Sequence, residues 1–194
     1  MAVENSSSTS LIAGVVNTQK LGLLGHSFGG AVGLSAIADR CLPRYCQNSF
    51  TRPKELLAGA FYETGLQDQN TLKYIPINNS GIGVALLQGD LKGRVLPNTP
   101  LTTYDQIQTP PKAFINISGT NHFSITNINN VPGAIPDPVA PTLDKDVTVE
   151  MIACLRGYLE HRSKTPIGIQ VLWRAGVSSE SGSSFEEGKQ ADGS

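Results

Sequence analysis

The residues in this chain best suited to chemistry are the five at 25–29, which read Gly-His-Ser-Phe-Gly. This Gly-x-Ser-x-Gly pattern is typical of a serine nucleophile at a sharp turn between a strand and a helix. The turn strains the backbone, and the close contact between strand and helix requires small residues, which Gly25 and Gly29 supply. The pattern therefore predicts that Ser27 projects its hydroxyl out of a sheet.

The segments on either side favour this interpretation over a glycine-rich turn without chemistry. Residues 20–24 are mostly apolar, as in a buried parallel strand. Residues 30–38 are small and apolar, as in a helix that packs on a sheet. The sequence thus predicts a strand, then Ser27, then a helix that runs to about Arg40.

A nucleophilic serine needs a base to accept its proton, and His122 is the best candidate. It lies just past the apolar run 112–117, and parallel strands bring their carboxyl ends to one rim where ligands bind. We therefore expect His122 and Ser27 on the same rim. His26 is interpreted as packing or loop support, and His161 as the end of a surface helix, where a cation offsets the helix dipole.

An acid should orient the histidine, and folds with such a turn order these residues as Ser, then Asp or Glu, then His. Asp90 is favoured because it comes soon after the apolar run 83–88. Asp68, some way past the run 56–62, is the alternative. If neither interpretation holds, Asp90 is a solvated turn residue.

The apolar runs alternate with helical patterns, which indicates an α/β fold with a mostly parallel sheet of about four strands and flanking helices. A short helix is expected over residues 102–108 and a longer amphipathic helix over 144–161. Residues 11–16 read as the remnant of a further helix that leads into the first strand.

The domain organisation follows from the position of the serine. Only 26 residues precede Ser27, whereas one strand–helix–strand unit takes roughly 30. We therefore expect residues 11–162 to form the C-terminal part of a domain, with residues 1–10 disordered and 163–194 an irregular, largely disordered tail. The first strand would then be a sheet edge with open backbone groups, which predicts possible self-association.

The composition limits the partners. Apolar residues make up 39%, charged residues 16%, and the net charge is −1, so nothing points to nucleic acid. No apolar stretch approaches the roughly 18 residues of a membrane span, and no signal peptide is recognisable, so a cytoplasmic location is expected. Three free thiols are favoured, with a Cys41–Cys46 bridge as the alternative on export. No metal site is expected.

These motifs resemble the α/β-hydrolase superfamily, most closely its dienelactone-hydrolase-like esterases, which include platelet-activating-factor acetylhydrolases and chlorophyllase-like enzymes. Residues 25–30 are similar to the serine motif of the acetylhydrolases. Residues 119–123 are similar to the histidine loop of this branch, and 124–127 resemble chlorophyllase-like relatives. The resemblance covers about residues 11–160.

The resemblance implies a serine hydrolase that cleaves apolar or lipid-like carboxylic esters, such as short acyl lipids or a phytyl-type ester, through an acyl-enzyme and without a cofactor. Ser27 would be the nucleophile, His122 the base and Asp90 the acid. The backbone N–H of Phe28 would be one of two donors to the oxyanion.

Two departures from the family pattern open an alternative. Many relatives carry the acid three residues after the strand-end glycine, here Gly89, and that position is Lys92. The second oxyanion donor is expected from a loop that would precede this chain. On this alternative, the chain is a catalytically impaired fragment that binds or pairs. An acyl transferase with the same three residues is a further reading.

Overall fold

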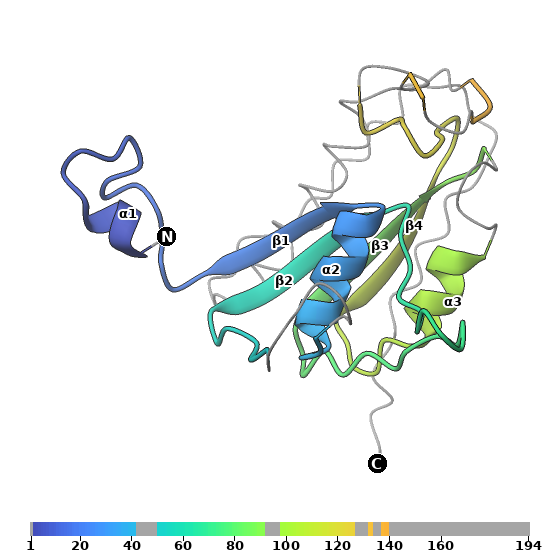
Figure 1. Cartoon of the computed structure of the whole chain (residues 1–194), viewed down its shortest axis with the longest axis horizontal. Coiled ribbons are helices and arrows are strands. Elements are labelled where there is room, and N and C mark those ends of the chain that lie inside the picture. The colour runs from blue at the N-terminus through green and yellow to red at the C-terminus, as the bar shows by residue number, and fades with distance from the viewer. Residues whose placement is uncertain (1, 42–49, 92–97, 127–131, 134–136, 140–194) are drawn as a thin grey trace, which may run out of the picture.

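The computed structural model describes residues 2–41, 50–91, 98–126, 132–133 and 137–139. Within them, four strands form a single sheet with helices packed against it (Figure 1). The strands are β1 (Leu21–His26), β2 (Leu56–Tyr62), β3 (Gly83–Gly89) and β4 (Lys112–Ile117), and they lie in that order. Every neighbouring pair is parallel. The expected α/β fold with a parallel four-stranded sheet is confirmed.

The two middle strands explain why apolar runs predicted the sheet so well. All but one residue of β2, and all but one of β3, are buried. A parallel strand covered on both faces must be apolar throughout, which gives a continuous run and not an alternating pattern. These strands therefore form the centre of the core.

Two described helices cover the same face of the sheet. The helix α2 (Phe28–Ile37) packs on β1 and β2, and α3 (Thr99–Asp105) packs on β3 and β4 (Figure 1). Leu34, Phe61 and Leu86 lie in the core between helices and sheet. A second apolar cluster, which includes Ala60, Tyr62, Leu87 and Ile115, forms apart from it. Helix α2 ends at Ile37, before the expected Arg40, and α3 begins before residue 102.

Glycines let α2 approach the sheet closely. A Cβ on Gly30 would lie 2.7 Å from the Thr64 side chain, and one on Gly33 would lie 2.3 Å from the Phe61 ring. A Cβ on Gly29 would meet no atom within 4 Å. The tight contact that the motif assigned to Gly29 is therefore made by the next glycine, because position 29 faces away from the sheet.

The segment before β1 differs from the expectation. A short helix, α1 (Ala2–Ser6), lies within residues 1–10, whereas residues 11–15 form turns. The helix expected at 11–16 is wrong, because Gly14 has a φ of 70° and its N–H bonds back to the Asn5 carbonyl at 2.8 Å. The helix expected at 144–161 and the tail 163–194 lie outside the described residues.

Cys41, four residues past the end of α2, is disulfide-bonded. The favoured prediction of a free thiol is therefore wrong for Cys41. Cys46 and Cys154 lie outside the described residues. In the part of the chain that the structure describes, no helix combines the length and the apolar character needed to cross a bilayer.

Candidate active site

Ser27 sits at the turn between β1 and α2 in a strained conformation, with φ 53° and ψ −123°. Its N–H donates to the Tyr62 carbonyl at 3.0 Å, and its carbonyl accepts from Ala31 N–H and from the Thr64 hydroxyl, at 3.2 and 2.6 Å. A Cβ on Gly25 would lie 2.8 Å from the backbone of the first helical turn. Such strain persists only where the surroundings over-determine it, as these contacts do here.

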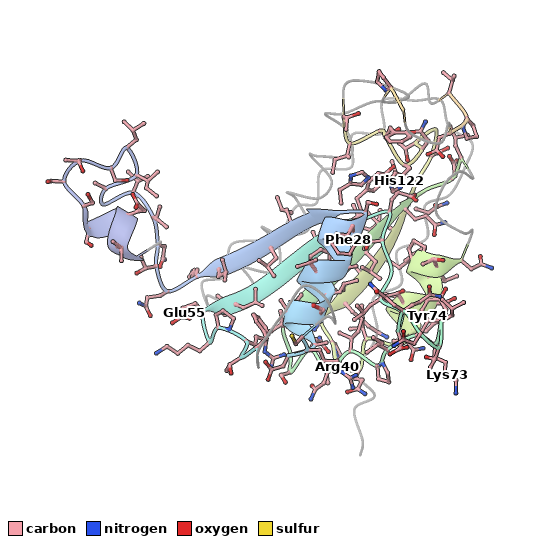
Figure 2. All side chains as sticks on the ribbon, viewed as in Figure 1. Phe28, Arg40, Glu55, Lys73, Tyr74 and His122 are labelled. Carbon is pink, nitrogen blue, oxygen red and sulfur yellow. The ribbon has the colours of Figure 1, made fainter. Side chains whose placement is uncertain are left out.

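His122 follows β4, and it lies near the same end of the sheet as Phe28, the residue after Ser27 (Figure 2). The histidine is only 6% exposed. Its ring packs against the ring of His26, with a centroid distance of 4.5 Å. Because His26 directly precedes Ser27, the histidine loop contacts the residue just before the turn.

The backbone around His122 is held at three points. Its N–H donates to Asp137 Oδ2 at 2.9 Å, and its carbonyl lies 2.8 Å from His26 Nε2. The hydroxyl of Tyr62 donates to the Asn121 carbonyl at 2.5 Å. His26 and Tyr62 are register partners at the ends of β1 and β2, so neighbouring strands hold consecutive carbonyls of the histidine loop. This fixes where the imidazole can lie.

Glu63, the residue directly after β2, carries the carboxylate that faces this imidazole. Its Oε2 lies 3.9 Å from His122 Nδ1, and its Oε1 accepts the Gly89 N–H at 2.6 Å. Glu63 is 6% exposed, and its φ of 48° is strained. The His122 Nδ1 atom is buried and has no hydrogen-bond partner among the described residues, so Glu63 lies where a small shift would give it one.

Asp90 has a different place from the one expected. Its carboxylate is exposed and accepts the Ser118 hydroxyl at 2.8 Å and the Gly119 N–H at 2.7 Å. It therefore holds the start of the histidine loop, and the ion pair to the His122 ring within the described residues comes from Glu63. The sequence analysis predicted Asp90, with Asp68 as the alternative, and missed Glu63, although Glu63 also follows a strand and lies between Ser27 and His122 in the chain.

The remaining residues considered in the sequence analysis lie elsewhere or outside the described residues. Asp68 lies in the loop after β2, where its Oδ1 accepts the N–H groups of Asn70 and Thr71 at 3.0 and 2.8 Å. Those bonds lower the pKa of the Asp68 carboxyl. Lys92 lies outside the described residues, as does His161. Asp137, which no sequence pattern singled out, is the acid that binds the His122 backbone.

The electrostatics keep His26 neutral. The pKa of His26 is lowered to about 4, mainly by burial and then by the nearby His122, while the contact with the His122 carbonyl partly opposes both. A neutral imidazole bonded to a carbonyl must donate, so His26 carries its proton on Nε2. The interpretation of His26 as loop support agrees with this geometry. Burial raises the pKa of Tyr62, so its hydroxyl also stays a donor.

Two hydrogen bonds of a complete proton relay are not made among the described residues, the one from Ser27 to His122 and the one from His122 to Glu63. Ser27 is partly exposed, and among the described residues no hydrogen bond joins its hydroxyl to the His122 ring. Catalytic hydrogen bonds are often long in enzymes without substrate and tighten when substrate binds. The distance of 3.9 Å between Glu63 Oε2 and His122 Nδ1 is likewise longer than a hydrogen bond. The structure thus places a buried carboxylate beside His122, whose ring contacts the residue before Ser27.

Phe28 begins α2, so its N–H belongs to the first turn, where the helix dipole favours negative charge. That position suits the oxyanion donor expected from the sequence. No group of three or more metal-ligating side chains gathers within the described residues. No protein-family model and no curated protein matches this chain.

Proposed function

We propose that this chain is a serine-dependent hydrolase of carboxylic esters. The observation that carries the proposal is the strained backbone of Ser27, held between the end of strand β1 and the N-terminus of helix α2. Strain of this kind costs on the order of 1–3 kcal/mol and is concentrated at functional sites. The contact of the preceding residue, His26, with the His122 ring supports a shared site.

In the proposed reaction the Ser27 oxygen attacks the ester carbonyl carbon while His122 takes the hydroxyl proton. The N–H of Phe28 stabilises the negative oxygen of the tetrahedral intermediate. When the bond to the alcohol breaks, His122 returns the proton to the leaving oxygen. Water then attacks the acyl-enzyme by the same route and regenerates Ser27.

Glu63 takes the role of the acid in this proposal, in place of Asp90. Its carboxylate would accept the Nδ1–H of His122, fix the tautomer with the free electron pair on Nε2, and stabilise the charged ring. A contraction of about 1 Å from the present separation would bring the pair to hydrogen-bond distance. The proposal needs no metal and no cofactor.

The experiment is hydrolysis of p-nitrophenyl esters by the purified chain. We expect turnover with a burst of p-nitrophenol, because acylation releases it before water frees the enzyme. Ser27→Ala should abolish the turnover, whereas Ser8→Ala, in the exposed segment before β1, should retain it. A folded chain with no turnover, or equal turnover after Ser27→Ala, would refute the hydrolase.

One observation favours a second candidate, a module that pairs with another chain. Strand β1 is an edge of the described sheet, and Leu24 within it is 51% exposed. An open strand edge can pair with a strand of a second copy. Under this candidate the chain forms dimers and hydrolyses nothing, which size-exclusion chromatography alongside the ester assay distinguishes. An acyl transferase would instead require an alcohol to compete with water.

The oxidation state of Cys41 bears on the cellular compartment of the protein. A cytoplasmic location stays a prediction from the sequence. The disulfide at Cys41 argues against it, because structural disulfides persist mainly in oxidising compartments. Alkylation of the protein in cell extracts before and after reduction would show whether Cys41 is oxidised where the protein resides.

A further inference from the structure

A pocket of about 320 Å³ lies beside the first turn of α2. One wall is formed by Phe28 and Ala31, which come one and four residues after Ser27. The other wall is formed by residues 65–69 and Leu72, from the segment after β2 that runs beside α2 (Figure 1). The two residues before this segment are Glu63 and Thr64, so both walls begin at the candidate active site.

The walls hold apolar side chains in exposed positions. Phe28 is 48% exposed and Leu72 is 70% exposed, while Leu66 is buried. Leu72 has a φ of 56°, a conformation that a leucine adopts only at a cost. An apolar side chain exposed to solvent on a strained backbone is unusual, and its place on the pocket wall favours contact with a ligand.

The loop that carries Leu72 is well built. The Leu72 N–H donates to the Asp68 carbonyl at 2.8 Å, and the Asp68 N–H donates to the Lys73 carbonyl at 2.9 Å. Gln67 and Tyr74 close the loop through an antiparallel bridge. These bonds hold the backbone of the exposed Leu72 in place opposite α2.

The charges around the pocket limit what it can bind. Asp68 is the one charged residue among the pocket's lining residues, and bonds from Thr71 and Asn70 lower the pKa of its carboxyl. The carboxylate therefore stays ionised at neutral pH and would repel an anionic chain. Among the described residues that line the pocket, there is no lysine or arginine to offset it.

We infer that this pocket binds the apolar chain of a neutral ester whose carbonyl is attacked by Ser27. The inference rests on the proposed function and adds the residues that select the substrate: Phe28, Leu66 and Leu72 contact the chain. The chain could belong to the acid or to the alcohol of the ester. The two are distinguished by varying the acyl group of p-nitrophenyl esters and, separately, the alcohol of acetate esters.

The test compares kcat/KM for p-nitrophenyl octanoate and p-nitrophenyl acetate, and for octyl acetate and ethyl acetate. Leu72→Asn removes the apolar wall, and asparagine tolerates the left-handed backbone at this position. We expect the long-to-short ratio to fall about tenfold in one of the two series. Leu101→Asn, at a 42% exposed leucine of α3 outside the pocket, should leave both ratios unchanged. Unchanged ratios after Leu72→Asn, with wild-type turnover intact, would overturn the pocket but not the hydrolase.

A binding measurement keeps the inference testable if no turnover is found. Leucine methyl groups labelled with ¹³C are followed by NMR while 2-decanone, a neutral ketone that cannot be hydrolysed, is added to the Ser27→Ala chain. We expect shifts confined to Leu66 and Leu72 that saturate, and we expect octanoate to cause none. Saturable shifts elsewhere, or none at either leucine, would overturn the inference whether or not Ser27 is a nucleophile.

Discussion

Glu63 and Asp90 occupy the same kind of place in the chain, each directly after a buried strand of the parallel sheet. Each carboxylate also accepts a backbone N–H from the end of the next strand or just beyond it, Gly89 and Gly119 respectively. They differ in burial. Glu63 is 6% exposed and faces the His122 ring, whereas Asp90 lies in solvent and holds the base of the histidine loop.

The difference shows that residues at the carboxyl end of the sheet contact different parts of the histidine loop. The middle strand β2 brings Glu63 under the histidine loop, where low solvent access strengthens its interaction with an imidazolium. Strand β3 ends one strand further from Ser27, and among the described residues the Asp90 carboxylate at its end accepts bonds from the loop backbone and a serine. Two acids at similar places in the sequence thus differ: Glu63 lies beside the His122 ring, and Asp90 holds the backbone of the loop that carries it.

The largest expected effect separates these two acids directly. Glu63→Gln keeps an acceptor for Gly89 but loses the charge beside His122. We expect kcat for ester hydrolysis to fall about 10³–10⁴-fold, as in other hydrolases that lose this charge. Asp90→Asn should lower kcat less than about tenfold, because it acts only on the loop. Steady-state kinetics of both variants makes the comparison, and a larger loss in Asp90→Asn than in Glu63→Gln would reverse it.

Burial also separates two adjacent glycines. Gly30→Ala would press a Cβ against Thr64, and we expect it to lower the free energy of unfolding by about 1–3 kcal/mol. Gly29→Ala meets open space and should raise helix stability by up to about 1 kcal/mol. Urea unfolding followed by circular dichroism measures both. Equal destabilisation by the two substitutions would contradict the packing of α2.

The pH dependence of stability tests the buried side of the site. His26 takes up a proton near pH 6.5 in the unfolded chain but only near pH 4 in the folded one. Stability is therefore full above pH 6.5 and falls as the pH drops from 6.5 to 4. Allowing for partial exposure of the ring, we expect wild type to lose about 1–2 kcal/mol more than His26→Gln between pH 7 and 4.5.

Both proteins retain His122 and Glu63, so other titrations largely cancel in that difference. Urea unfolding at the two pH values provides the measurement. If His26→Gln lost as much stability as wild type, the buried neutral state of His26 would be wrong.

The smallest effect concerns the exposed acid. Asp90→Ala removes the acceptor for Ser118 and Gly119, and we expect it to lower the free energy of unfolding by about 1 kcal/mol. Differential scanning calorimetry would detect this as a small fall in Tm. A fall as large as that of Gly30→Ala would mean that solvent does not replace these bonds.

Much of the fold could be predicted from the sequence because buried parallel strands leave a simple pattern. The runs at 56–62 and 112–117 match β2 and β4 at both ends. The helix at residues 2–6 could not be predicted, because its short polar sequence has no helical period. The helix predicted at 11–16 does not form, because Gly14 has a left-handed backbone conformation.

The site was predictable where local sequence determines it and not where packing does. The place of Ser27 follows from its flanking residues, and that of His122 from the strand before it. Glu63 was also visible as the acid after a strand, but its contact with the histidine depends on which strands are neighbours. Asp137 binds His122 from a loop rich in proline, and nothing in that stretch indicates the contact.

The most direct test of the proposed site is labelling by a fluorophosphonate, read by mass spectrometry of the digested protein. These probes react with a serine only when a base activates it. The proposal predicts that the folded chain carries the label on Ser27, that the urea-unfolded chain carries none, and that Glu63→Gln reacts far more slowly than Asp90→Asn. A folded chain that takes no label at Ser27 would contradict it.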